Sequence, residues 1–440
     1  MNRIMNAAFA AIQPSSTLAI ARAAKNMKAE HGPNFADLAS GDVADHGPIF
    51  TLFRESALTA ARVSSSSRYP TQNPELEEAI LELHAKVRGG NLGYRDPAII
   101  FFGGGCKGAL SAAFKAFASY RDLVVRGSVG WPSHPEIAAL EGRAWETIPT
   151  ESTAGVLTGQ QLLDFISGRP RNEGLEEMPL VKILLLETHV NPTGVCHTAE
   201  QMQELAEAVR ALVKRYPDCV IVIDGVYEAI TFGEKPIPHL LAYAPELSER
   251  VVLCGSLTKC FALADLRLGY MIGEKPMIDK LKSAYGHLQN GVSFFLQETA
   301  LSVMLNGVGY PTAAELLGDE EAPPGRSVPG LLGLWAFERV QNIKSALQCT
   351  ILSMVGDPTG AIYVCLDVSS FIGVEHRGQV SQDATQIAER LMEEALVATM
   401  PCGGMGLPNC LRITLLGDQL ADVDAGIERM LGWFGVNVAA

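Results

Sequence analysis

The stretch Gly255 to Gly269, GSLTKCFALADLRLG, places a lone lysine, Lys259, just beyond an apolar run that is typical of a buried strand. Two hydroxyl side chains and an arginine accompany this amine: Ser256, Thr258 and Arg267. In an open α/β sheet, ligands bind beyond the carboxyl ends of the strands. The stretch therefore predicts a strand end that presents an amine, two hydroxyls and a guanidinium to a ligand.

Six short apolar runs recur between helical patterns and predict the strands of one sheet. Their continuous apolarity, without alternation, indicates strands buried on both faces, as in a parallel sheet covered by helices. Between them, residues 199–216 carry Met202, Leu205, Val209 and Leu212 on one helical face. We therefore expect an α/β sandwich from about residue 70 to about residue 290. The predicted strands are Ala98–Phe102, Leu123–Val125, Val181–Leu186, Val220–Ile223, Val251–Leu253 and Leu268–Ile272.

Composition and charge exclude several classes of protein. The chain has 440 residues, of which 48% are hydrophobic and 19% charged, with a net charge of −14. An acidic chain without a basic stripe is a poor nucleic-acid binder. The nine cysteines form no C-x-x-C pair, so we expect neither a disulfide framework nor a metal site. No apolar span is long enough to cross a membrane, and we expect a cytoplasmic protein.

The composition of the sequence changes after residue 306, and the pattern that follows suggests a second, smaller α+β domain. Residues 307–333 are rich in Gly and Pro and predict an exposed insertion or loop. Strands are expected at Ile362–Leu366 and Leu411–Thr414, and helices at Leu334–Leu347, Thr385–Ala395 and Leu420–Phe434. The predicted division is an N-terminal segment of the small domain at 1–60, a large domain at 61–306, the insertion at 307–333 and the small domain at 334–440.

Each motif at a strand end is ambiguous when it is taken alone. The sequence GGGCKGAL, Gly103 to Leu110, opens a helix whose free N–H groups suit an anion, but it lacks the ending of a nucleotide-binding P-loop. The tetrad NPTG at Asn191 to Gly194 is also compatible with a simple turn. A buried carboxylate such as Asp224 needs a partner for its charge. His189 reads more readily as a packed core residue than as a catalyst.

The joint order of these motifs is far more specific. Along the chain come GCKGAL at Gly105, WPSH at Trp131, NPTG at Asn191, Asp224 with Tyr227, SLTK at Ser256 with Arg267, and LRIT around Arg412. In this order the sequence resembles the pyridoxal-phosphate enzymes of fold type I, and among them the class I/II aminotransferases related to aspartate aminotransferase. The resemblance is full-length, because PSSTLAI and the Gly41 region are similar to the family's N-terminal segment. It implies a mostly parallel seven-stranded sheet between helices, plus a smaller α+β domain.

The resemblance also implies roles for individual residues around pyridoxal 5'-phosphate. Lys259 would form the internal aldimine and later move the substrate proton. Asp224 would face the pyridine nitrogen and keep it protonated, oriented by His134. Asn191 and Tyr227 would hydrogen-bond the phenolic oxygen, with Tyr227 part of the catalytic set.

The remaining roles concern the ring face, the phosphate and the substrate. Trp131 would stack on the cofactor ring. Arg412 would grip the α-carboxylate of an amino acid through a planar fork, in a substrate site shared with Gly41, Asn191 and Trp131. Tyr69 resembles the tyrosine that reaches the phosphate of the partner subunit in a homodimer. The phosphate would rest on Gly105, Cys106, Lys107, Ser256, Thr258 and Arg267.

The expected function is an aminotransferase that moves an amino group from an α-amino acid to a 2-oxo acid by a ping-pong route. No second arginine stands near GHLQNGVSF, where dicarboxylate-specific members carry one and Gln289 is found here, so aspartate and glutamate are not the expected first substrates. The same cofactor chemistry also supports elimination, replacement or cyclisation at Cβ or Cγ, which keeps a lyase or biosynthetic enzyme as the alternative. A transcriptional regulator would need an extra DNA-binding module, for which we expect the N-terminus to have neither the room nor the basic charge.

Overall fold

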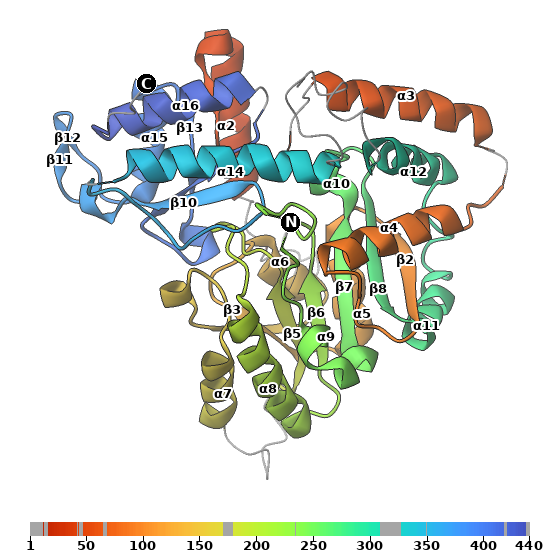
Figure 1. Cartoon of the computed structure of the whole chain (residues 1–440). Helices are drawn as coiled ribbons and strands as arrows, with labels where there is room; N and C mark the ends of the chain where they lie inside the picture. Colours follow the sequence, from red (N-terminus) through yellow and green to blue (C-terminus); the bar gives the residue numbers. More distant parts are fainter. Residues whose placement is uncertain are drawn as a thin grey trace, which may run out of the picture.

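A seven-stranded sheet forms the centre of the molecule (Figure 1). The computed structural model describes residues 12, 16–41, 43, 47–64, 68–169, 179–233, 235–308, 327–348, 350–417 and 420–436. The strand order is β2-β8-β7-β6-β5-β3-β4, and all neighbours are parallel except β8, which runs antiparallel to β2 and β7. The strands are β2 (Pro97–Gly103), β3 (Leu123–Gly127), β4 (Ala144–Ile148), β5 (Val181–Glu187), β6 (Val220–Asp224), β7 (Val251–Ser256) and β8 (Leu268–Glu274).

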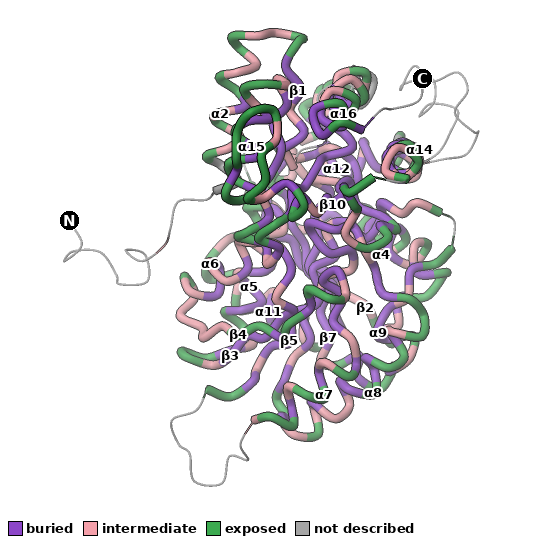
Figure 2. The backbone as a smooth tube through the Cα atoms, turned by 90° about the vertical axis from the view of Figure 1, so that its left-hand side faces the viewer, coloured by how far each residue is buried: buried purple, intermediate pink, exposed green. Residues whose placement is uncertain are grey.

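Helices cover both faces of this sheet, and alternate residues of one strand supply the two hydrophobic layers. On β2, Ile100 and Phe102 pack in one layer and Ile99 and Phe101 in the other. The first layer includes α5 (Cys106–Phe117), α6 (Ser133–Leu140) and α11 (Lys275–Tyr285). The second includes α4 (Pro74–Val87), α7 (Gly159–Gly168) and α8 (Ala199–Arg215). The six predicted strands are largely buried (Figure 2), which confirms the α/β sandwich and these strands.

A smaller α+β unit lies beside the large sheet. Its antiparallel sheet has the order β14-β15-β10-β9, and β11 pairs with β12 in a short hairpin. Helices α14 (Val328–Ala346), α15 (Ala384–Glu394) and α16 (Leu420–Trp433) accompany it. The strands are β9 (Ser353–Met354), β10 (Tyr363–Asp367), β11 (Glu375–His376), β12 (Gln379–Val380), β13 (Val397–Ala398), β14 (Met400–Pro401) and β15 (Cys410–Thr414).

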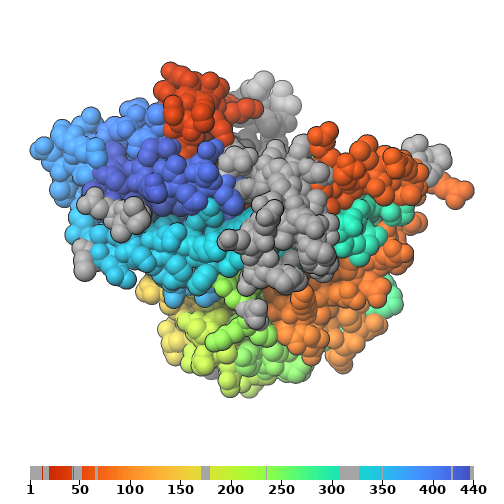
Figure 3. All heavy atoms as spheres, turned by 45° about the horizontal axis from the view of Figure 1, so that its top comes forward, coloured from red at the N-terminus to blue at the C-terminus, as the bar shows by residue number. Residues whose placement is uncertain are grey.

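The N-terminal segment contacts both units. Strand β1 (Ala36–Asp37) pairs in parallel with β13, so α2 (Ser16–His31) lies beside the C-terminal helices, where red and blue atoms adjoin in Figure 3. Helix α3 (Gly47–Val63) instead packs on α12 (Phe294–Val308) of the large unit. The short helices α9 (Leu240–Tyr243) and α10 (Leu257–Cys260) complete the large unit.

The expected insertion at residues 307–333 is shorter than predicted. Its first residues, Gly307 and Val308, end α12, and Val328 to Gly333 form the start of α14, where Val328, Leu331 and Leu332 are buried. Residues 309–326 lie outside the described part of the chain. No helix in the described ranges is both long and apolar enough to span a membrane.

Candidate active site

The carboxyl ends of β3, β5, β6 and β7 deliver the predicted motifs to one edge of the sheet, where a cavity of about 390 Å³ opens between the two units. Three further predicted residues lie next to lining residues. Ser256 ends β7, Gly105 packs against Arg267, and His134 contacts Asp224. Five residues that the motif analysis did not assign also line it: Glu187, His189, Val226, Ala264 and Tyr363. The predicted residues that line it are Gly41, Cys106, Lys107, Trp131, Asn191, Asp224, Tyr227, Thr258, Lys259, Arg267 and Arg412.

Asp224 is the anion at the base of the cavity. It is the last residue of β6 and is 5% exposed. His134 Nε2 lies 2.9 Å from Asp224 Oδ2, while Oδ1 accepts the Val226 N–H at 3.2 Å. The Cys106 thiol also donates to Oδ1, at 3.6 Å, and burial together with this carboxylate holds the pKa of Cys106 well above its ordinary value. Three donors therefore keep Asp224 in one orientation.

Glu187 is a second carboxylate in the cavity, at the end of β5. Its Oε1 accepts the Trp131 N–H at 3.2 Å and lies 3.8 Å from His134 Nδ1. Burial raises the pKa of Glu187 to about 8, with Asp224 adding to the rise and Arg126 opposing it. Its side chain is 7% exposed, so a charge there is poorly solvated.

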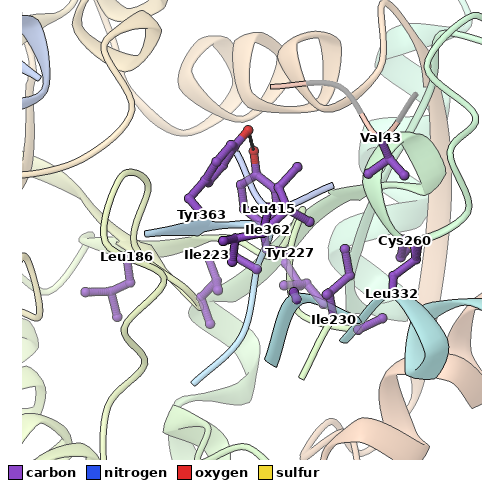
Figure 4. Packing of buried hydrophobic residues seen from close by; sticks show 14 of the residues in the cluster. Val43, Leu186, Ile223, Tyr227, Ile230, Cys260, Leu332, Ile362, Tyr363 and Leu415 are labelled. Atoms are coloured by element: carbon purple, nitrogen blue, oxygen red, sulfur yellow. Dashed lines mark hydrogen bonds between the residues drawn. The ribbon is translucent and has the colours of Figure 1, made fainter. Parts of the chain in front are cut away.

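Lys259 stands where β7 passes into α10. Its Nζ donates to the Gly41 carbonyl at 2.5 Å. The Tyr363 hydroxyl donates to the same carbonyl at 3.2 Å and lies 2.9 Å from the Tyr227 hydroxyl, a pair visible in Figure 4. Burial raises the pKa of Tyr227 well above its ordinary value, and Tyr363 adds to the rise, so the phenol is a hydrogen-bond donor at neutral pH. The amine and two phenols thus gather around one backbone carbonyl.

Cations and hydroxyls gather where α5 begins. Arg267 Nη2 donates to the Gly104 carbonyl at 2.7 Å, and Ser256 Oγ lies 2.5 Å from Thr258 Oγ1. Lys107 Nζ lies 5.1 Å from the centre of the Trp131 ring, and burial, Arg267 and Lys259 lower its pKa.

Close glycine packing holds this end of the cavity together. A Cβ on Gly108 would collide with the Gly103 carbonyl, and a Cβ on Gly269 with the Gly105 carbonyl. Glycine at position 108 therefore lets the first turn of α5 lie against the end of β2, and glycine at position 269 lets the start of β8 lie against the residue before α5. This packing directs the N–H groups of the helix start and the cationic side chains to a common place, which suits a phosphate.

Arg412 lies on β15 and faces the cavity from the small unit. It is 2% exposed, donates Nη1 to Asn191 Oδ1 at 3.2 Å and Nη2 to the Ala39 carbonyl at 2.7 Å, and stacks on Tyr363 with its Cζ 4.1 Å from the ring centre. Its buried Nε has no hydrogen-bond partner among the described residues. A guanidinium that is oriented by protein contacts and retains an unused N–H is well prepared for a carboxylate.

His189 is buried, as the sequence suggested, and Tyr69 lies at the surface. His189 is 2% exposed and lines the cavity, yet neither ring nitrogen has a hydrogen-bond partner in the part of the chain that the structure describes. Burial lowers its pKa to about 4, so the ring is neutral. Tyr69 is 82% exposed and is not a lining residue. The sequence signal for His189 was its position as a polar residue in ETHVNPTG, a motif that follows a strand.

Comparisons with known proteins agree with this geometry. The family model described as aminotransferase class I and II matches residues 33–308. The chain is 27% identical to an aspartate aminotransferase of Streptomyces avermitilis, covering 97% of this chain and 96% of that one. It is also 27% identical to a probable aspartate/prephenate aminotransferase of Rickettsia bellii, covering 96% and 97%. The crystal structure of the aspartate aminotransferase from Rhizobium meliloti has the same fold, with a TM-score of 0.75, 21% identity, and coverage of 98% and 99%.

Proposed function

We propose that this chain, which belongs to the aminotransferase class I and II family, moves the amino group of an α-amino acid to a 2-oxo acid by a ping-pong route. Enzymes of this family are transferases that depend on pyridoxal 5'-phosphate. The observation that carries the proposal is that Lys259, Asp224 and Arg412 line one cavity, so that an amine, an anion and a carboxylate-binding guanidinium face the same space.

The residues of the cavity fit the cofactor. The start of α5, Thr258, Arg267 and Lys107 offer N–H groups, a hydroxyl and positive charge for a phosphate, and Ser256 supports Thr258. Asp224 is the anion for the pyridine nitrogen, Trp131 offers a ring face, and Asn191 and Tyr227 offer donors for the phenolic oxygen. When bound, the cofactor supplies an aldehyde for attachment of amines and an electron-poor ring that stabilises negative charge at Cα.

Each protein group then has a distinct task. Arg412 holds the substrate carboxylate and thereby fixes which bond of Cα faces the amine. Lys259 takes the Cα proton and returns it, because an amine that lines the cavity can act as both base and acid at Cα. The Tyr227 phenol remains protonated and donates, since its pKa is raised.

The residues around the cavity also bear on which substrate side chains the enzyme prefers. We infer that aspartate and glutamate are not preferred, because Gln289 is uncharged and its Nε2 donates to the Phe101 carbonyl at 3.1 Å. Lys107 is the opposing observation, since its ammonium lines the cavity and could pair with a second carboxylate. In Lys107→Met, a fall in kcat/KM for aspartate relative to a neutral amino acid, with unchanged cofactor affinity, would assign Lys107 to the substrate and refute our inference. A loss of cofactor affinity with an unchanged ratio would assign it to the phosphate.

The decisive experiment is an absorbance spectrum of the purified protein with cofactor and a panel of amino acids, with Lys259→Ala as control. A visible band that is lost with an amino acid and restored with a 2-oxo acid supports transamination. Released ammonia, or loss of the band that no 2-oxo acid reverses, supports the lyase alternative. A wild-type protein that shows no band after addition of cofactor would refute both.

A homodimer and a cytoplasmic location complete the proposal. The exposure of Tyr69 is compatible with a contact to the cofactor site of a second copy. Tyr69→Phe should then weaken cofactor binding in a sample that elutes as a dimer. A monomeric sample with full cofactor occupancy would contradict the assignment of Tyr69.

A further inference from the structure

A buried arginine continues the Asp224–His134 pair away from the cavity. Arg126 is on β3, is 5% exposed, and places Nη1 2.8 Å from His134 Nδ1. The same Nη1 donates to the Trp131 carbonyl at 2.9 Å, and Nε donates to the Gly127 carbonyl at 2.9 Å. These carbonyl contacts hold the guanidinium plane against the imidazole ring.

The contact with Arg126 determines where His134 carries its proton. A guanidinium has N–H donors and no acceptor, so the His134 Nδ1 that faces it must be the unprotonated nitrogen. A neutral imidazole has one N–H, which then lies on Nε2, the atom that is 2.9 Å from Asp224 Oδ2. Burial is the main cause that lowers the pKa of His134, and Arg126 adds to it. Asp224 thus receives a hydrogen bond from a neutral donor.

Glu187 lies beside Arg126. A Cβ on Gly130 would lie 2.5 Å from Glu187 Oε2 and 2.6 Å from Arg126 Nη1, so both groups pack against this Cα. With a pKa of about 8, Glu187 is mostly protonated at neutral pH. Burial lowers the pKa of Arg126, and Glu187 and Asp224 oppose this. Glu187 also accepts the backbone N–H of Trp131, the residue expected to cover the cofactor ring. His134, Glu187 and Asp224 come close enough for a metal ion, but the guanidinium of Arg126 already supplies the positive charge between them.

We propose that Arg126 is a positioning residue that keeps the proton of His134 on Nε2 and so holds Asp224 as an accepting carboxylate toward the cofactor. This inference rests on the proposed function in one respect, namely that Asp224 faces the pyridine nitrogen. The placement of the proton itself depends on protein contacts alone. It is therefore testable with and without cofactor.

The first test is nitrogen NMR of the full chain labelled with ¹⁵N in its histidine rings, in the cofactor-free and cofactor-bound forms. His134→Gln assigns the signals of His134. We expect an unprotonated Nδ1 and a protonated Nε2 in both forms. A protonated Nδ1 in the wild-type protein would overturn the proposal without any other variant. Failure of the wild-type protein to bind cofactor would refute the proposed function and leave the cofactor-free spectrum as a valid test.

The second test removes the guanidinium. In Arg126→Met we expect His134 to lose its single tautomer, and kcat to fall by about tenfold or more with little change in KM, the size of effect seen when a group that orients a site residue is lost. Arg126→Lys keeps a cationic donor and should restore the tautomer in part. Arg143→Met is the matched control, because Arg143 donates Nε to the Phe114 carbonyl and does not line the cavity.

Glu187→Gln separates charge from hydrogen bonding. The glutamine retains an acceptor for the backbone N–H of Trp131 and cannot ionise. We expect the His134 tautomer to persist and the protein to be no less stable at pH 8, because the burial that raises the pKa of Glu187 no longer opposes folding as the pH rises from 4.5 to 8. An unchanged His134 spectrum in Arg126→Met, in a sample that melts as the wild type does, would show that Arg126 has only a packing role and would end the proposal.

Discussion

Arg412→Lys tests whether the guanidinium on β15 holds the substrate carboxylate. The arginine is buried, is oriented by Asn191 Oδ1 and the Ala39 carbonyl, and leaves its Nε without a partner among the residues that the structure places. Lysine keeps the positive charge but cannot offer two parallel N–H groups to one carboxylate. The substitution therefore removes one hydrogen bond of the fork and leaves the net charge unchanged.

The size of the effect follows from the type of hydrogen bond that is lost. A hydrogen bond to a charged group contributes about 1.5–3 kcal/mol, which corresponds to a loss of about 10- to 150-fold in kcat/KM. Cofactor affinity should remain close to that of the wild type, since Arg412 lies on β15 of the small unit, whereas the proposed phosphate site is at the start of α5 in the large unit. The loss should be similar for all α-amino acids, whatever their side chain.

The assay compares each amino acid with the amine in which hydrogen replaces the α-carboxylate. Arg412→Lys should reduce turnover of the amino acid by the factor above and change turnover of the amine by less than about twofold, because the amine has no carboxylate to lose. Arg429→Lys is a suitable control, since Arg429 lies on α16 and donates to the Ala395 carbonyl. An equal loss with both substrates would refute a carboxylate contact and point to a structural role for Arg412.

Three further predictions concern stability, packing and the titration of the bound cofactor. The pKa of His189 is about 4 in the folded chain against an ordinary 6.5, so the unfolded chain takes up a proton first as the pH falls and stability is lost between these values. At pH 5 His189 accounts for a loss of about 2 kcal/mol relative to pH 8, so His189→Leu should reduce the loss measured by urea unfolding by that amount, whereas the exposed His287→Gln should not. Gly108→Ala should destabilise the protein by about 1–3 kcal/mol, because its Cβ meets a backbone carbonyl; Gly168→Ala, whose Cβ would meet nothing within 4 Å, should not. Tyr363→Phe removes the partner of Tyr227 and one donor to Gly41, so the visible band of the bound cofactor should titrate at a different pH, and an unchanged titration would contradict this.

The interior of the large sheet and its edge strand β2 could be predicted from the sequence, but the other edge strand, β4, could not. The strands β5, β6 and β7 read as continuous apolar runs because helices cover both of their faces. The edge strand β4 reads Ala-Trp-Glu-Thr-Ile, with two exposed residues at its centre, and therefore carries no such signal. Its position is set by parallel pairing with β3, which depends on tertiary structure.

The start of α14 shows a second limit. Its Gly- and Pro-containing sequence predicted a loop, yet the helix begins at Val328. Ser327 accepts the Gly330 N–H at 3.4 Å with its side chain, and Pro329 stands in the first turn, where the missing N–H costs no helical hydrogen bond. Burial of Leu331 and Leu332 then offsets the low helix propensity of the glycines. Packing against the rest of the fold, which the local pattern does not contain, decides this helix.

The residues of the candidate site also divide into those that the sequence could predict and those that it could not. Residues in the motifs at strand ends could be predicted, because the topology of a parallel sheet brings the carboxyl ends of its strands together. Tyr363 could not, since its place opposite Tyr227 depends on how the small unit meets the large one. His189 was within a motif, but its unpaired nitrogens appear only once its neighbours are known.

Arg126 and Glu187 were not assigned from the sequence, but their positions in it suggest an additional way to find site residues. Each is an ionisable residue near the end of a strand, in LVVRG and in VKILLLE, and the two strands are neighbours in the sheet. Burying an ionisable group is costly unless neighbouring polar groups satisfy it or its pKa shifts. Ionisable residues that end adjacent parallel strands therefore predict a buried polar cluster at the ligand edge of the sheet. Here Arg126 contacts His134 and, through it, Asp224, so the search for site residues should include the last residues of each strand as well as the motifs that follow them.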